Sequence, residues 1–216
     1  MKWKIPLDIG MTLALLLLMG YGLIGEKTHE WIGVGMFLLF LGHLILNRKW
    51  FKGLGKGRYT PARIARTVGN ALIFLCMIGC MVSGVMLSRY VFAFLPVHGG
   101  LELAGQIHIL YSHWGFVLMS LHLGAHLTML RTAVEKQYPL PVWAGRCLTW
   151  LGYFLALYGL FAFFKRDFPD YLLLRSHFVF YDYSQPVVYF LLDYVCILAL
   201  FTAVGNAGIR LLQKRK

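Results

Sequence analysis

Charged side chains are scarce in this chain of 216 residues, of which Asp, Glu, Lys and Arg make up 14%. Soluble globular domains carry about 25%, and a water-exposed surface with so few charges would be one continuous apolar patch. Hydrophobic residues make up 59% of the chain, and its net charge is +12. Because that charge is spread between apolar runs, a nucleic-acid partner is not expected. The composition predicts an all-α polytopic membrane protein.

Six apolar runs are long enough to cross the hydrocarbon core, which takes roughly 20 helical residues. They cover Ile5–Ile24, Trp31–Asn47, Val68–Phe94, Leu103–Leu130, Val142–Phe164 and Val187–Leu211. Nothing is left over for a second domain, so residues 1–216 are predicted to form a single transmembrane domain. Within it we expect a four-helix core over 1–131, two additional spans over 132–216, and one long extracytoplasmic segment at 165–186.

The positions of Lys and Arg predict the orientation of the chain, since cytoplasmic loops carry the excess of these residues. Most of the 21 cations fall into four groups at alternate connections between the spans. These groups are Lys2 with Lys4, residues 48–66, residues 131–146 and the tail 210–216. Both termini are therefore expected in the cytoplasm of a multi-pass inner-membrane protein, with attraction to anionic lipid headgroups as a secondary effect.

Histidine is abundant where other polar residues are rare, with eight in the chain. Ionisable residues within spans are costly and usually functional. His29 and His43 bracket the second span, while His108 and His122 lie in the fourth, and each pair is separated by 14 residues. On a helix this spacing places both rings near one face, about 21 Å apart. Because spans two and four are predicted to be parallel, His29 lies level with His108, and His43 with His122.

Two levels of facing imidazoles are what two stacked haem groups with bis-histidine ligation require. No Cys-x-x-Cys-His motif occurs, so two non-covalent haem b groups are expected. Gly33 and Gly115 lie on the histidine faces, where a missing side chain leaves room for a macrocycle. Arg89 is expected either to bind haem propionates or to snorkel to the interface. A non-haem metal or a proton pathway is the other interpretation of the histidines.

Helical phase ranks the remaining histidines. His113 points away from the ligand face and is expected to be a hydrogen-bonded core residue. His126 follows His122 by one turn, so it is either an alternative inner ligand or a partner for a propionate or a quinone. His98 and His177 are expected in the extracytoplasmic connections.

Several segments carry a resemblance to a known family. They are Leu18 to Gly25, His29-Glu-Trp-Ile-Gly33, His43 to Asn47, Ser83 to Phe92, Trp114 to His126 and His177 to Tyr183. They resemble the flavinylation-associated cytochrome family of cytochrome b-like membrane proteins. The resemblance implies haem b in a four-helix core, with electrons passing to extracytoplasmic flavoproteins that carry covalent flavin. It assigns the ligand role to His29, His43, His108 and His122, with His126 a contender.

The expected function is that of a di-haem b-type cytochrome, an electron-transfer subunit between a cytoplasmic or quinol donor and an extracytoplasmic flavoprotein. The chain has no flavin attachment motif, so any covalent flavin belongs to the partner. A second interpretation is the quinone-reactive anchor of a membrane dehydrogenase, with quinone near His126 or Asp193. A third is a haem-free transporter or assembly factor. Whether Asp8 and Asp193 relay protons or only bond neighbouring helices is left open.

Overall fold

The computed structural model describes residues 4–97 and 99–214, which form nine α-helices and no strand. His98, whose position was predicted above, lies outside the described residues, as do Lys2, Arg215 and Lys216. The helices are α1 (Lys4–Met19), α2 (Tyr21–Ile24), α3 (Glu26–Leu46), α4 (Arg48–Gly53), α5 (Pro61–Leu87), α6 (Leu101–Gln137), α7 (Val142–Lys165), α8 (Phe168–Leu172) and α9 (Val187–Lys214). The predicted all-α class is confirmed.

Glycine and proline set several of the helix boundaries. Gly25 separates α2 from α3 with φ at 83°, a left-handed conformation that glycine adopts without strain. α5 begins with Pro61 in its first turn, where the missing N–H costs nothing. Its N-cap is Thr60, whose Oγ1 accepts a hydrogen bond from the backbone N–H of Arg63 at 3.3 Å.

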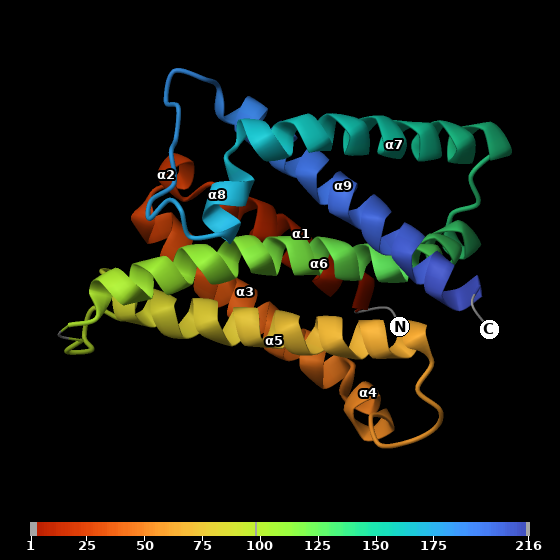
Figure 1. The fold of residues 1–216 in the computed structure, drawn as a ribbon, viewed down its shortest axis with the longest axis horizontal. Helices are drawn as coiled ribbons and strands as arrows, with labels where there is room; N and C mark the ends of the chain where they lie inside the picture. The colour runs from red at the N-terminus through yellow and green to blue at the C-terminus, as the bar shows by residue number, and fades with distance from the viewer. Residues whose placement is uncertain (1–3, 98, 215–216) are drawn as a thin grey trace.

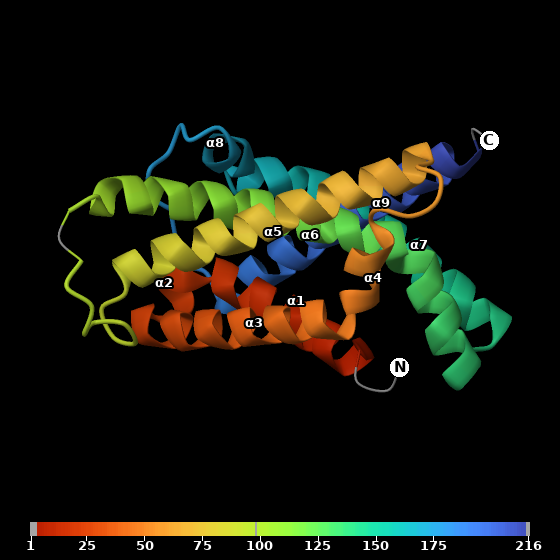
Figure 2. The same ribbon diagram turned by 90° about the horizontal axis from the view of Figure 1, so that it is seen from below.

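The long helices alternate in direction (Figures 1 and 2). α3, α6 and α9 run one way, and α1, α5 and α7 run the other. Both termini lie at one end of the bundle, which we call the termini end. The opposite end, which we call the loop end, holds the connection after α5 and residues 166–186. The predicted parallel arrangement of spans two and four is thus present as α3 and α6.

Four helices are long and apolar enough to cross a membrane, namely α3, α5, α7 and α9. They indicate a membrane protein. The helices that correspond to predicted spans one and four, α1 and α6, do not belong to this group. α1 has 16 residues, and α6 has 37 but carries four histidines that lower its mean hydropathy. The six-span count therefore stays a prediction.

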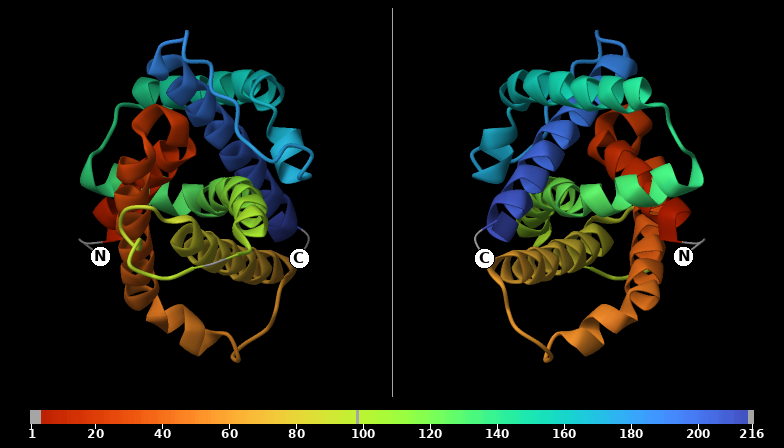
Figure 3. Two further views of the ribbon diagram at one scale, coloured as in Figure 1. Left: turned by 90° about the vertical axis from the view of Figure 1, so that its left-hand side faces the viewer. Right: turned by 90° about the vertical axis from the view of Figure 1, so that its right-hand side faces the viewer.

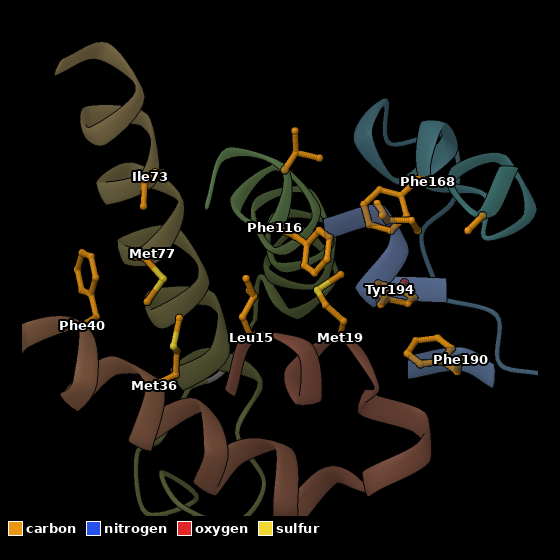
Figure 4. Packing of buried hydrophobic residues seen from close by; sticks show 13 residues of the cluster. Leu15, Met19, Met36, Phe40, Ile73, Met77, Phe116, Phe168, Phe190 and Tyr194 are labelled. Carbon is orange, nitrogen blue, oxygen red and sulfur yellow. The ribbon is translucent and has the colours of Figure 1, made fainter. Parts of the chain in front are cut away.

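Apolar side chains fill the middle of the bundle (Figure 4). Met36 and Phe40 of α3 lie near Ile73 and Met77 of α5, and Phe116 of α6 is fully buried. The cluster continues through α1, α8 and α9, with Leu15, Met19, Phe168, Phe190 and Tyr194. Met36 is seven residues from both His29 and His43, so this apolar layer separates the two histidine levels along α3.

α9 packs closely against both α6 and α7, as the end-on views show (Figure 3). A Cβ atom at Gly124 of α6 would overlap the carbonyl oxygen of Thr202, and one at Gly159 of α7 would overlap that of Cys196. Small residues are the usual means by which membrane helices bring their backbones together. α6 therefore lies between α5 and α9, which are its two main neighbours.

Candidate functional site

The two histidines at the loop end face each other across the bundle. The ring centroids of His29 on α3 and His108 on α6 are 6.0 Å apart, with an interplanar angle of 66°. Two histidines that bound one metal ion from opposite sides, each at about 2.0 Å, would have ring centres roughly 6 Å apart. The observed separation would suit such a pair, and it brings together the residues that the sequence predicted for this level.

Ser83 on α5 fixes the protonation pattern of His108. The Ser83 hydroxyl donates to the carbonyl oxygen of Gly79 at 2.6 Å, and its oxygen lies 3.0 Å from Nδ1 of His108. A hydroxyl has a single hydrogen, so once this hydrogen is given to Gly79, the Ser83 oxygen accepts from Nδ1–H of His108. Nε2 of a neutral His108 then keeps its lone pair, which is the form that binds a metal.

His29 carries an orphaned polar atom. Its Nδ1 is buried and has no hydrogen-bond partner within the described residues. The ring otherwise contacts Tyr21 edge-on, with centroids 5.1 Å apart. A buried nitrogen without a partner is unfavourable, so this imidazole fits a site in which a bound group supplies the missing interaction.

Glu30 holds the loop end together. Its carboxylate accepts hydrogen bonds from the Ser88 hydroxyl at 2.7 Å and from three backbone N–H groups. These belong to Arg89, Tyr90 and Val91, at 2.8, 3.1 and 2.8 Å. The bonds tie the start of α3, which carries His29, to the end of α5, which carries Ser83. Glu30 was not predicted as a site residue, although an acidic residue beside a predicted ligand is a usable signal in a chain with 9 Asp and Glu.

At the termini end, Asp8 on α1 orients His43 on α3. Their Oδ1 and Nδ1 atoms are 2.8 Å apart, so the ring donates Nδ1–H to the carboxylate and leaves Nε2 as an acceptor. This is the carboxylate–histidine arrangement that commonly supports a metal ligand. Lys4 Nζ also donates to Asn47 Oδ1 at 2.7 Å, which ties the same two helices together. Asp8 therefore bonds a neighbouring helix, and a role in proton transfer stays a prediction.

His122 and His126 lie side by side on α6, with ring centroids 4.6 Å apart and tilted by 52°. Among the ring contacts of the described residues, none joins His43 to either of them, so the termini-end level is not closed in the way that the His29–His108 pair is. The choice between His122 and His126 therefore stays open.

Two polar residues of α5 lie at the termini end without partners. Nε of Arg66 and Oδ1 of Asn70 are buried and form no hydrogen bond within the described residues. The charge of Arg66 is close enough to act on His122 and His126. In the sequence, Arg66 was interpreted only as one of the cations that indicate topology. Its spacing of four residues from Asn70, which places both on one face of α5, was the clue that distinguished it.

Three predicted site residues have other surroundings than expected. Arg89 is not brought to the histidine pair, because its side chain is 75% exposed and its Nη1 lies 3.4 Å from Oε1 of Glu26. Gly115 faces α5, where an added Cβ would contact Cβ of Cys76 at 3.5 Å. Gly33 faces α1, where the nearest atom to an added Cβ is Cδ2 of Leu18 at 3.9 Å. Both distances are ordinary van der Waals contacts, and a role of either glycine beside a macrocycle stays a prediction.

His113 is a buried core residue, as predicted. It is 2% exposed, its Nδ1 lies 2.8 Å from the carbonyl oxygen of Ile109, and its ring centroid lies 4.6 Å from that of Tyr171. It takes no part in the His29–His108 pair. His177 is exposed in the segment between α8 and α9.

Asp193 of α9 is occupied by ion pairs. Its Oδ2 lies 2.9 Å from Nζ of Lys165 and 2.7 Å from Nε of Arg166, and its Oδ1 accepts from the Tyr158 hydroxyl at 2.9 Å. The carboxylate is 2% exposed. It thus bonds α7 and the turn after it, and a quinone near Asp193 stays a prediction.

The segment between α8 and α9 folds back onto the loop end. Within this segment, the Tyr181 hydroxyl donates to the carbonyl oxygen of Met19 at 3.1 Å. Just before it, the Trp114 indole donates to the carbonyl oxygen of Leu172, the last residue of α8, at 3.0 Å. Burial raises the pKa of Tyr181 to about 12, so this donor stays protonated over the physiological range. Burial also raises the pKa of Tyr171, whose hydroxyl oxygen accepts from the backbone N–H of Phe180 at 3.2 Å.

The histidine pair is distinct from a conventional metal cluster. Within residues 4–97 and 99–214, no group of three or more His, Cys, Asp or Glu side chains is placed to hold a metal ion. Haem iron would take only two protein ligands, and the loop-end pair supplies two imidazoles.

Comparisons with protein-family models, curated proteins and solved structures gave no match. The family resemblance seen in the sequence consequently stays a hypothesis.

Proposed function

We propose that this protein is a di-haem b-type membrane cytochrome that passes electrons across the cytoplasmic membrane. The observation that carries the proposal is the His29–His108 pair, with ring centroids 6.0 Å apart on two parallel helices. In the proposed topology all six long helices span the membrane, and both termini face the cytoplasm. Bound haem would supply one-electron transfer, while the protein supplies ligation, orientation and electrostatics.

The residues around each level have distinct parts in this proposal. Ser83 holds His108 in the tautomer that leaves Nε2 free, and Glu30 fixes the distance between α3 and α5 at the loop end. At the termini end, Asp8 orients His43. Arg66 offers an unpartnered cationic group that suits a haem propionate. The apolar layer around Met36 excludes water between the levels, which shields both sites from solvent.

The proposed electron acceptor is an extracytoplasmic flavoprotein with covalent flavin, and the donor is a cytoplasmic protein or a quinol. The family resemblance supplies this part of the proposal. Exposed aromatic side chains at the loop end support a contact with another protein or with the lipid interface there: Phe178 is 59% exposed, Phe180 66% and Tyr183 75%.

The decisive experiment is spectroscopic. The full chain, produced with haem supplied, is purified, and its reduced-minus-oxidised spectrum is recorded together with its haem content per chain. The proposal expects a b-type α-band and two haem groups per chain. A protein that is folded but shows no such band would refute the proposal, and with it the quinone-reactive alternative described next.

A second candidate function is a quinone-reactive cytochrome b anchor of a membrane dehydrogenase. The polar residues at the termini end favour it, because Arg66 and Asn70 have buried polar atoms without partners close to the His122–His126 pair. Oxidation of the dithionite-reduced protein by a menaquinone analogue, followed at the haem α-band, tests it. If Arg66→Gln slows this oxidation and leaves haem content unchanged, the quinone site is supported; equal rates in both proteins would argue against it.

A further inference from the structure

A groove lies between the C-terminal part of α6 and the N-terminal part of α7, at the termini end and far from the loop-end histidines. Its volume is about 530 Å³, and the connection over Pro139–Pro141 closes one side. The side chains that give it chemical character are Arg131, Glu135, Arg146, Thr149, Trp150 and Tyr153. None of them takes part in the proposed haem sites.

Two arginines give the groove a positive charge. Arg131 bridges the helices: its Nε lies 2.6 Å from Oε1 of Glu135 on α6, and its Nη1 donates to Oγ1 of Thr149 on α7 at 3.3 Å. Glu135 therefore compensates one cation. Arg146 is exposed and forms no ion pair with any described residue, so its charge is available to a ligand.

The start of α7 adds to this charge. Its N-cap is Pro141, and no side chain caps the helix. The first N–H groups of a helix have no intrahelical partners, and the helix dipole makes this end partially positive. Val142 at this end lines the groove together with both arginines. A phosphate group is the type of anion that such a helix end and two guanidinium groups bind together.

Two aromatic side chains line the groove and are exposed. Trp150 is 73% exposed and Tyr153 is 56% exposed. Both belong to α7, which is apolar enough to cross a membrane, and both lie about two to three turns beyond its cationic start. The groove thus has cationic side chains at the start of α7 and aromatic side chains further along it. The same order, from charged to apolar, is found on passing from water into a membrane.

We propose that this groove binds one anionic phospholipid. The phosphate lies between Arg131, Arg146 and the N-terminus of α7, and an acyl chain runs along Trp150 and Tyr153. Charge complementarity selects a lipid with net negative charge over a zwitterionic one, because the choline of the latter brings a second cation to Arg146. The site does not depend on haem, so the two proposals can fail separately.

The experiment measures lipid retention by the full chain. The protein is reconstituted with phosphatidylglycerol or with phosphatidylcholine, and the lipid molecules that stay bound after transfer to detergent are counted by native mass spectrometry. Phosphatidylglycerol is expected to be retained and phosphatidylcholine lost. Arg146→Gln should weaken phosphatidylglycerol binding about fivefold, the effect of one cation near a membrane surface.

Arg210→Gln is the matched control, because Arg210 is exposed at the same end on α9 and lies outside the groove. It should bind phosphatidylglycerol like the unaltered protein. Equal retention of the two lipids, or equal binding by both variants, would overturn the proposal. The proposal would also be overturned if millimolar inorganic phosphate displaced phosphatidylglycerol completely, since the ligand would then be a free anion. The thermal midpoint of each variant shows that it is folded.

Discussion

The two histidine levels differ in how completely the protein assembles them. At the loop end, His29 and His108 face each other at 6.0 Å, and His108 is held by a neutral hydroxyl. At the termini end, His43 is held by a carboxylate, and His122 and His126 lie next to each other on α6 without a ring contact to His43 among the described residues. At the loop end, two histidines face each other, and the anchor of one of them is the neutral hydroxyl of Ser83. At the termini end, the anchor of His43 is the carboxylate of Asp8, but no described histidine faces it in a ring contact.

This difference has a physical consequence for tuning. A carboxylate that accepts Nδ1–H makes the imidazole a stronger electron donor than a hydroxyl does. A haem at the termini end would therefore have its oxidised, more positive form stabilised more, which lowers its reduction potential.

The largest expected effect is the loss of one haem on substitution of the closed pair. In His108→Ala the loop-end iron would lose an axial ligand, so haem content should fall from two groups per chain to one, as measured by the pyridine haemochrome assay. His113→Leu is the matched control, because His113 is a buried histidine of the same helix outside the pair, and it should keep both groups. Retention of two groups in folded His108→Ala would contradict the assignment.

The termini end is expected to lose its haem in His43→Ala and in only one of the two substitutions on α6. If His122→Ala lowers haem content to one group per chain and His126→Ala does not, His122 is the ligand. The opposite result assigns His126. If both single variants keep two groups, the termini-end pairing is wrong.

Substitution of the residues that hydrogen-bond the histidines, Asp8 and Ser83, should weaken haem binding less than loss of a histidine does. Of these two, Asp8→Asn should have the larger effect. Loss of a carboxylate partner weakens metal binding about 10- to 100-fold, so the termini-end haem should be released at a lower competitor concentration in a transfer assay to apomyoglobin. The loop-end haem should be unaffected. Equal release from both levels would argue against a specific bond between Asp8 and a haem-binding His43.

Ser83→Ala should weaken the loop-end haem by about tenfold or less, since a neutral hydrogen bond contributes roughly 0.5–1.5 kcal/mol. Ser83→Thr keeps the hydroxyl and should restore binding. The same transfer assay provides the measurement. An effect larger than that of Asp8→Asn would reverse the ranking of the two anchors.

The smallest effect on haem is expected for Glu30→Gln, whose main effect is on stability. The amide keeps one carbonyl oxygen for the N–H groups of Arg89 to Val91 but loses the charge, so we expect a loss of about 1–2 kcal/mol in the free energy of unfolding. Thermal denaturation in detergent measures it. Glu102→Gln, an exposed change at the start of α6, is the control and should leave the midpoint unchanged.

Much of the fold was predictable because membranes simplify the problem. Length, apolar runs and the placement of Lys and Arg predicted the parallel course of α3 and α6. The 14-residue spacing then predicted that His29 and His108 would be level, because helix rise and rotation are regular. His29 and His108 lie near the starts of their helices. A small difference in tilt between α3 and α6 therefore displaces these two residues little from the predicted level.

The termini-end level was harder to predict. His122 is two-thirds of the way along the apolar part of α6, and Figure 2 shows that α6 bends towards its C-terminal end. A helix period read from sequence contains neither bend nor tilt, so a prediction made at one end loses accuracy at the other. Gly115 shows the same limit: its phase suggested the histidine face, but the structure turns it to Cys76.

Side-chain partners were the least predictable part of the site. Ser83, Glu30 and Asp8 each bond a residue on another helix, at sequence separations of 25, 58 and 35. A local signal can mark one partner, as the acidic Glu30 beside His29 did, but the other partner depends on which helices are neighbours and how closely they approach. Arg89 is the converse case, since a position near the membrane boundary suggested a ligand role and the structure gives it Glu26 instead.

The close approach of α9 to Gly124 and Gly159 also has a meaning for biosynthesis. Along the chain, α9 follows α3, α5, α6 and α7, so it is synthesised after all of them. Until α9 is present, the glycine faces of α6 and α7 lack the helix that they contact in the folded protein, and these backbone contacts cannot form. His29 and His108 are therefore synthesised early, but the packing around α6 is completed only once α9 has been made.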